Sequence, residues 1–421
     1  MVALPRRGAA AVIPWCPQCL AGLRDYDRSY APWRGLAWVG AWGYRRGIDL
    51  DDSLVSELAG DPATAARRTH SESALMAISA VIVAVSAAAF AAAVLVWRTD
   101  LLPPVKFAAS VGSLILAMWL RPKFTRRRIG EATELPEGGA PALRDLVGQV
   151  STAAAAPLPD VILLDPAMVN CSVTRVGVRG RVVLTIGIPL WLMLTPAMRI
   201  SVLAHEFGHV ANRDPTRRVL AQPALHLFRS AVEWTGGSGQ LRRLAADAED
   251  GPQLPWMVLV LRLLLALVNN ALAAVQLAID TIAMPDHRRA EYAADLTSRS
   301  VAGTAAATAT MNRLAGLSEL AGALAYDVER LAPLHWEQSL SVHSKRIEAD
   351  LPVLRQATRR TADVWSVHPP AGCRVELLDR LATLPPEVAV DPILFARIDA
   401  ELANFYARTH SVFLGTREFA G

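Results

Sequence analysis

The chain has 421 residues, which is enough for more than one domain. Hydrophobic residues make up 52% of it and charged residues only 19%, a more apolar balance than soluble globular proteins show. The formal net charge is +4, and the basic residues cluster beside apolar runs, which argues against a nucleic-acid-binding surface. The four cysteines, at positions 16, 19, 171 and 373, do not form a disulfide framework, so a reducing compartment fits better than secretion.

Residues 1–70 carry no secretory signal, because Arg6-Arg7 is not followed by an apolar core. Cys16-Pro17-Gln18-Cys19 has the spacing of one half of a zinc ribbon, but no second half follows it. The spacing of Cys16 and Cys19 therefore favours a loop and leaves a bound metal as the alternative. We expect this segment to be cytoplasmic and assign it no chemistry.

Two apolar segments follow and predict a transmembrane hairpin over residues 71–121. Residues 74–97 are uncharged and long enough to cross a bilayer, and residues 101–120 form a second span with Lys106 near its start. Basic residues flank both ends of the hairpin: Arg67, Arg68, Arg121, Lys123, Arg126, Arg127 and Arg128. The positive-inside bias therefore predicts that both ends, and whatever follows them, are cytoplasmic.

A linker rich in Gly, Pro and Glu, residues 131–141, leads into a predicted helix over residues 142–155. Three β-rich runs come next, at residues 160–164, 171–176 and 181–186, and the last two are predicted to form a hairpin. A small sheet thus directly precedes the next helix. Its edge strand could hold an extended peptide by main-chain hydrogen bonds.

That next helix contains His205-Glu206-Phe207-Gly208-His209, and start and stop signals bracket it (Thr195-Pro196 and Asn212). His205 and His209 are four residues apart, so their imidazoles share one helix face and can bind one ion. Glu206 directly follows His205 and so points to a neighbouring side of the helix, within reach of a water bound to that ion. This is the H-E-x-x-H pattern of zinc hydrolases, which have two ligands and a general base. The alternative is an amphipathic helix whose histidines are core residues.

Two further apolar segments, 219–234 and 256–284, carry polar stripes and leave two arrangements open, either two membrane crossings or none. After Pro285, Asp286 is expected to cap a new helix that contains Glu291 and Asp295. Glu291 would complete a two-His, one-Glu zinc site, and Asp295 could accept the other ring N–H of a ligand histidine. Spacing alone supports equally well the alternative that Glu291 and Asp295 are ordinary surface charges, beside Arg288 and Arg289.

Three blocks, in this order, resemble the HtpX-like membrane zinc metallopeptidases, a family that also contains the type I CAAX prenyl proteases. The blocks are His205 to His209, Glu291-Tyr292-Ala293-Ala294-Asp295, and His368-Pro369-Pro370 followed by Arg374. The resemblance covers roughly residues 70–385. It implies a zinc-dependent endopeptidase that acts on membrane-associated or misfolded proteins, with a cytoplasmic active site at a bacterial inner membrane.

The resemblance also implies roles for particular residues. His205, His209 and Glu291 would bind one Zn²⁺, with Glu206 as the general base. His368 would stabilise the oxyanion with support from Arg374, and Asn170 would hold the substrate backbone. Without the resemblance, His368-Pro369-Pro370 indicates only a rigid turn before a helix.

We therefore expect a mostly helical α+β integral membrane protein, with a zincin-type domain whose small β-sheet lies beside the H-E-x-x-H helix. The expected parts are residues 1–70, the hairpin 71–121, a peptidase domain over 130–385 interrupted by apolar helices at 219–284, and a helix with a tail over 386–421. The expected partners are peptide substrates and the lipid bilayer, and the oligomeric state is left open. One rival is a membrane sensor-transducer, although residues 98–100 are too short to hold a sensing domain. The other is a non-catalytic zinc-stabilised scaffold, which would need four protein ligands.

Overall fold

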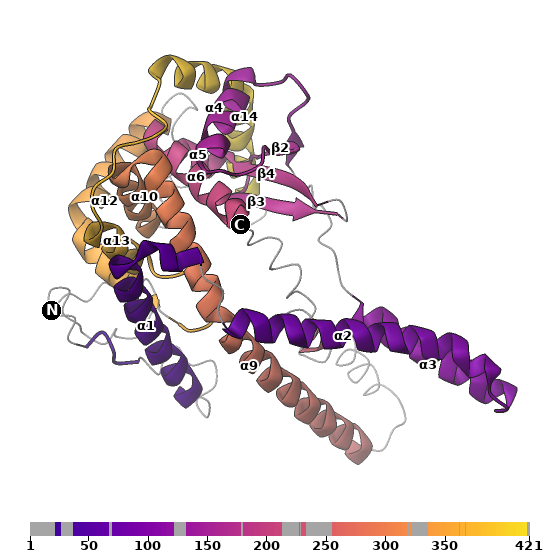
Figure 1. The fold of residues 1–421 in the computed structure, drawn as a ribbon. Coiled ribbons are helices and arrows are strands. Elements are labelled where there is room, and N and C mark those ends of the chain that lie inside the picture. The colour runs from indigo at the N-terminus through magenta and orange to yellow at the C-terminus, as the bar shows by residue number, and fades with distance from the viewer. Residues whose placement is uncertain are drawn as a thin grey trace. The chain divides into compact units, whose positions relative to one another are not determined.

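The computed structural model describes residues 22–26, 37–66, 70–121, 132–177, 180–212, 227, 229–232, 255–317, 320, 336–361, 363–366 and 368–418. Over these residues the chain is mostly helical with one small sheet, as expected (Figure 1). The pair Cys16 and Cys19, and most of residues 219–234, lie outside the described residues. The chain divides into two compact units. The first unit contains Met1–Arg67, Thr125–Pro215 and His287–Gly421, and the second unit contains Arg68–Phe124 and Thr216–Asp286.

The second unit is built from three apolar helices, which are α2 (His70–Leu95), α3 (Pro103–Leu120) and the first part of α9 (Pro255–Ala302). Among the described residues, three stretches are long and apolar enough to cross a membrane, namely Ser71–Arg98, Pro103–Leu120 and Ala266–Ala302. Most side chains of the first two stretches are exposed, including Phe90 and Phe107, and the first part of the third stretch also exposes large apolar side chains such as Leu267. Such surfaces suit lipid and not water.

Hydrogen bonds and a small core join the helices of this unit. Ser86 Oγ donates to the carbonyl of Ala117 at 3.0 Å, and Ser110 Oγ donates to the carbonyl of Ala93 at 2.8 Å, so α2 and α3 are linked at two levels. A cluster of buried apolar residues lies between the three helices (Leu75, Ile82, Leu120, Ile279 and Ala283). The connection from α2 to α3 holds only the short 3₁₀ helix η4 (Val96–Arg98) and four further residues, 99–102, which leaves no room there for a sensing domain.

The polar stripe of α9 makes contacts within this unit. Gln276 Nε2 donates to Asp280 Oδ1 at 2.8 Å, and Arg229 Nη2 lies 3.7 Å from the same oxygen. The carboxylate of Asp280 on an apolar helix is thus paired, as a charge in such surroundings requires.

The expected helix start at Asp286 was wrong. Helix α9 runs without a break from Pro255 to Ala302 and contains Pro285. Proline removes one backbone hydrogen bond, and the residues on both sides of it are good helix formers, so one turn absorbs the loss. The carboxylate of Asp286 accepts a hydrogen bond from Ser71 Oγ at 2.9 Å and so contacts α2 in place of capping a helix.

The first unit contains the sheet, whose strand order is β1-β2-β4-β3. Strands β2 (Val161–Asp165) and β4 (Arg181–Gly187) are parallel, while β1 (Thr133–Glu134) and β3 (Cys171–Val176) are antiparallel to their neighbours. The predicted β3–β4 hairpin is present, with Cys171 opposite Ile186. Strand β3 is the last in the order and pairs with β4 alone, so it is an edge strand of the described sheet.

The main core of this unit lies between one face of the sheet and three helices. These are α4 (Pro141–Ala153), α6 (Pro196–Ala211) and α14 (Pro392–Glu418). Glu401 of α14 accepts hydrogen bonds from the first backbone N–H groups of α4. The buried Arg199 of α6 donates to Asp399 of α14 at 2.8 Å and to a carbonyl of the short helix α5 (Ile188–Met193) at 3.0 Å. The start of α6 is therefore fixed by side chains as well as by apolar packing.

A second group of helices surrounds the C-terminal part of α9. It consists of α1 (Ala37–Gly60), α10 (Thr304–Ala315), α12 (Trp336–Thr358) and α13 (Ala371–Arg380). Buried side chains of α1, α9 and α13 form one cluster (Leu54, Val55, Leu58, Tyr292, Cys373 and Leu377). Since α9 also packs on α6, these helices complete the surroundings of the segment around Glu291.

Candidate active site

Helix α6 has one apolar face and one face that carries the motif. Ile200, Leu203 and Phe207 enter the main core, which turns His205 and His209 away from it. Pro196 occupies the first turn as predicted, and the helix ends at Ala211, where Asn212 N–H donates to the carbonyl of Gly208 at 3.0 Å. The two imidazoles pack edge to face with their ring centres 4.8 Å apart.

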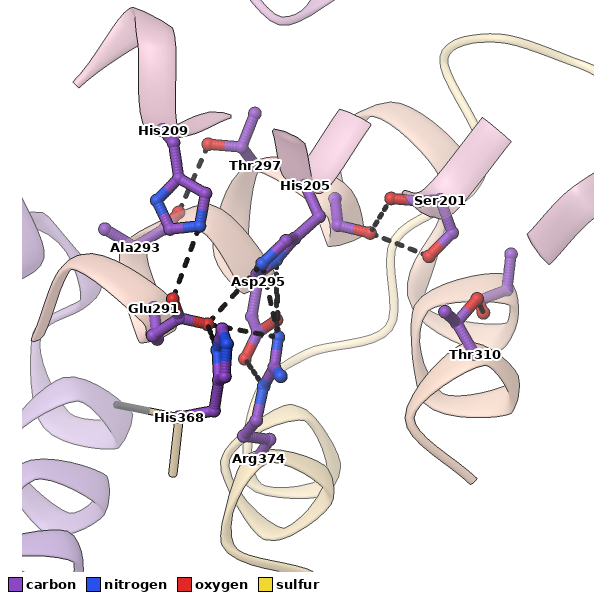
Figure 2. Close-up of polar contacts among 12 residues, drawn as sticks. Ser201, His205, His209, Glu291, Ala293, Asp295, Thr297, Thr310, His368 and Arg374 are labelled. Carbon is purple, nitrogen blue, oxygen red and sulfur yellow. Dashed lines mark hydrogen bonds and ion pairs between the residues drawn. The ribbon is translucent and has the colours of Figure 1, made fainter. Parts of the chain in front are cut away.

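Helices α6 and α9 run antiparallel in close contact. Ser201 and Ser298 share a hydrogen bond of 2.8 Å at one end of the contact. His205 faces Asp295 one turn further along α6, and His209 faces Glu291 at the other end. The antiparallel packing of the two helices therefore sets the imidazoles of α6 against the carboxylates of α9 (Figure 2).

The two histidines and Glu291 form a compact group of metal-ligand type. One potential ligand atom from each lies within 4.8 Å of the other two. His205 Nε2 is 3.6 Å from Glu291 Oε2, and His209 Nε2 is 3.5 Å from Glu291 Oε1. The side chain of Glu291 is 1% exposed, so it is not the surface charge that spacing alone allowed.

Asp295 and Arg374 lie on the far side of His205. Asp295 Oδ1 is 3.1 Å from His205 Nδ1, which directs Nε2 of the same ring toward Glu291. Arg374 binds both carboxylate oxygens of Asp295, at 2.7 and 2.5 Å, and its Nη2 lies 3.3 Å from His205 Nδ1. Arg374 thus contacts the ligand side of the site, whereas the resemblance implied support of His368.

The charges around His205 favour a positive group. Burial lowers the pKa of His205, but hydrogen bonds with Asp295 and Glu291 outweigh burial and raise that pKa to about 9. The pKa of His205 is raised because the carboxylates of Asp295 and Glu291 create a negative electrostatic potential at the imidazole ring. The same potential attracts a metal cation.

Glu206 contacts the edge strand and not the histidines. Its Oε2 accepts a hydrogen bond from the backbone N–H of Val173 at 3.2 Å. In an antiparallel pair the N–H groups of alternate residues point away from the partner strand. Because Val173 N–H points to Glu206, the backbone groups of Cys171 and Arg175 also face away from β4.

Asn170 lies immediately before β3, next to this edge. Its side-chain oxygen accepts the N–H of Cys171 at 2.9 Å, and its carbonyl accepts the N–H of Gly187 at 2.9 Å. A Cβ atom on Gly187 would lie 1.8 Å from the carbonyl oxygen of Met168, so only glycine allows the loop before β3 to pack this closely. The loop thereby fixes where the edge strand begins.

His368 approaches the site from the opposite side of Glu291. Its Nδ1 is 2.9 Å from Glu291 Oε2, while its side chain is 67% exposed. It precedes Pro369 and Pro370, and α13 begins directly after them. The structure therefore brings together six of the eight side chains that the sequence singled out, while Glu206 contacts the edge strand and Asn170 lies at the start of that strand.

Sequence reasoning missed the side chains behind Glu291. Arg288 is fully buried and forms a short ion pair with Asp51 of α1. It also donates to the carbonyl of Gly47 at 3.1 Å, and Tyr292 OH donates to Asp51 at 3.3 Å. No local pattern could indicate this contact, because Asp51 stands 237 residues before Arg288.

Gly208 sets the distance between the two site helices. A Cβ atom there would lie 3.0 Å from Ala294 Cα and 3.0 Å from Thr297 Cβ. We expect Gly208→Ala to destabilise the protein by about 1–2 kcal/mol, because overpacking outweighs the gain in helix propensity. Gly148→Ala in α4 is the control, since its nearest contact would be 3.9 Å, and it should stabilise by up to about 1 kcal/mol. Denaturant unfolding measures both, and equal signs would contradict this account.

The comparisons with known proteins agree with this geometry. The sequence profile of peptidase family M48 matches residues 139–382. A "Protease HtpX homolog" of Syntrophobacter fumaroxidans is 29% identical over 252 residues, which cover 59% of this chain and 78% of the relative. A "Protease HtpX homolog" of Pyrococcus abyssi is 27% identical, with 58% and 75% covered, and a "Protease HtpX" of Psychrobacter is 27% identical, with 49% and 64% covered. No solved structure matches. The chain belongs to peptidase family M48, as an HtpX-like membrane metallopeptidase.

Proposed function

We propose that His205, His209 and Glu291 hold one zinc ion and that the protein is an endopeptidase of membrane-associated or misfolded proteins. The grouping of these three side chains around one point carries the proposal. Two imidazoles and a carboxylate are the ligand set of catalytic zinc sites, in which a fourth position stays open. A closed structural site needs four protein ligands, and the group found among the described residues has three.

The surroundings of the three ligands fit a metal. Asp295 holds Nδ1 of His205, so the Nε2 lone pair is free to bind a cation on the Glu291 side. Arg374 fixes Asp295 in turn by two hydrogen bonds. We assign Asp295 and Arg374 to the positioning of His205, because each acts on the metal group through this ring.

Each remaining side chain has a task in peptide hydrolysis. A zinc ion in this site would act as a Lewis acid on the peptide carbonyl and lower the pKa of water. Glu206 takes up the proton of the attacking water on a carboxylate that Val173 N–H keeps in place. His368, whose side chain is 67% exposed, donates a hydrogen bond to the substrate carbonyl oxygen that becomes negative.

The edge of β3 supplies the substrate-binding groups. The outward carbonyl of Cys171 and the outward backbone groups of Arg175 can pair with an extended peptide as an added strand. This strand is aligned with the site because one of its own N–H groups already contacts Glu206. Asn170 holds the start of the strand and would contact the substrate backbone there.

We place the site on the cytoplasmic side of a bacterial inner membrane. The basic residues at both ends of the α2–α3 hairpin support this orientation by the positive-inside bias. Glu291 must then reach the same side as His205, so residues 213–286 cross the membrane an even number of times. The apolar part of α9 is long enough for one of two crossings, and the alternative is that residues 213–286 do not cross the membrane at all.

Removal of the metal tests the proposal. Purified protein treated with a chelator should lose peptidase activity, and one equivalent of Zn²⁺ per chain should restore it, because Glu206 alone cannot activate water. His209→Ala should lower the zinc content to near zero, whereas His343→Ala on α12 should leave it unchanged. Elemental analysis gives the zinc content, and a fluorogenic peptide gives the activity. Full activity in zinc-free protein would refute the metal site.

A further inference from the structure

Helix α1 places tryptophan on its solvent-facing side. Its buried side is formed by apolar residues (Tyr44, Ile48, Leu54, Val55 and Leu58). Trp38 is 69% exposed and Trp42 is 47% exposed. At 3.6 residues per turn, Trp38, Trp42, Arg45 and Arg46 fall within an arc of about 100° on the opposite side of the helix. A surface helix ordinarily carries only polar residues in such an arc.

A third tryptophan joins these two from another part of the chain. The rings of Trp42 and Trp365 are 6.0 Å apart and tilted by 46°. Gly43 permits the contact, because a Cβ atom there would lie 2.3 Å from the Trp365 ring, and its carbonyl accepts the N–H of Val364 at 3.0 Å. We call Trp38, Trp42, Trp365, Arg45 and Arg46 the tryptophan face. Trp365 stands three residues before His368, so the face is continuous with the loop that carries this site residue.

The charge of the tryptophan face is positive. Arg45 and Arg46 are exposed, and neither guanidinium has an ion-pair partner in the part of the chain that the structure describes. Asp49, the next acidic residue on the same side of α1, is already paired with Arg24 at 2.6 Å. Tryptophan beside unpaired arginine is the composition found where proteins contact lipid headgroups, since the indole ring has an apolar body and one N–H donor.

We propose that the tryptophan face lies in the headgroup region of the membrane that the chain itself crosses, and that it binds anionic lipid. Three observations carry this. The rings of Trp38 and Trp42 are exposed, the arginines complement anionic headgroups, and only residues 61–69 separate α1 from α2, where the first membrane stretch begins. The face also holds the loop of His368, so the site would receive peptides that lie on or emerge from that membrane surface.

Lipid quenching of a fluorescent label tests the contact. Full-length Glu206→Gln protein, with Cys16 and Cys19 replaced by serine, is labelled at Trp38→Cys or Trp42→Cys and placed in vesicles of phosphatidylcholine and phosphatidylglycerol. The two remaining cysteines are buried. Ala400→Cys, on an exposed position of α14, is the matched control. Lipids with a nitroxide near the headgroup should quench the labels at 38 and 42 but not the label at 400.

The arginines give a second measurement on the same samples. Quenching at position 42 should rise with the fraction of phosphatidylglycerol, and Arg45→Gln with Arg46→Gln should remove that rise. Labels at 38 and 42 that are quenched no more than the label at 400 would overturn the proposal. Labels that are shielded from aqueous iodide yet not quenched by lipid would overturn it as well, because a protein surface would then cover the face.

An activity measurement follows, and it alone depends on the proposed peptidase function. The double variant Trp38→Gln, Trp42→Gln should cleave a water-soluble peptide as fast as the unchanged protein does. Its kcat/KM for the same peptide carried on a lipid anchor should fall severalfold, since the membrane no longer holds the His368 loop close to the substrate. An equal loss on both peptides would indicate damage to the fold and would contradict the assignment, whereas the quenching result would still report the lipid contact.

Discussion

Replacing Glu206 by Gln should lower kcat/KM for a peptide substrate by about 10²–10⁴-fold, the usual contribution of a general base. The amide is nearly isosteric, and its oxygen can still accept the N–H of Val173, which is 3.2 Å from the carboxylate. The edge strand and α6 therefore keep their places. What is lost is the group that takes up a proton, so the loss should appear in kcat more than in KM.

The matched variant is Glu291→Gln, one of the three grouped side chains. It should lose both zinc and activity, whereas Glu206→Gln should lose activity and keep one zinc per chain. Elemental analysis beside steady-state kinetics separates the two. If Glu206→Gln also lost its zinc, Glu206 would be a ligand and another base would have to be found. If Glu206→Gln kept full activity, the proposed mechanism would be wrong.

Local patterns predicted the parts of the site that depend on local structure. The spacing of His205 and His209 places both imidazoles on one face of any regular helix, and Pro196 indicates where that helix starts. The β-rich run of residues 171–176 predicted strand β3 with its observed bounds. Each of these depends only on residues within one element, which is why no knowledge of the tertiary structure was needed.

Contacts between distant elements could not be predicted in this way. The hydrogen bond from Val173 to Glu206 depends on how the edge of the sheet packs against α6, and no spacing in the sequence encodes it. The stop signal at Pro285 was overridden, because helix-forming residues on both sides continue α9 through it. The burial of Arg288 could not be predicted, because its partner, Asp51, lies in a segment to which the sequence assigned no chemistry.

Asp51→Asn should destabilise the protein by about 3–5 kcal/mol, the cost of leaving a buried charge without its partner. Arg288 and Asp51 are both fully buried, and their ion pair lies one helical turn from Glu291. Asparagine has the shape of aspartate, so the packing of α1 is kept and only the charge is lost. Chemical denaturation of the purified protein, followed by loss of peptidase activity, gives the change in unfolding free energy.

Asp49→Asn is the control for this change, because Asp49 lies on the same helix in an exposed pair with Arg24 and solvent screening should limit its effect to about 0–1 kcal/mol. Adding Arg288→Met to Asp51→Asn should recover much of the stability, since the apolar side chain leaves no charge in the core. A double variant less stable than the sum of the single variants would contradict the pairing. Because residue 51 lies outside the segment 139–382 that the family profile matches, recovery would show that the N-terminal helix stabilises the segment of α9 that carries Glu291.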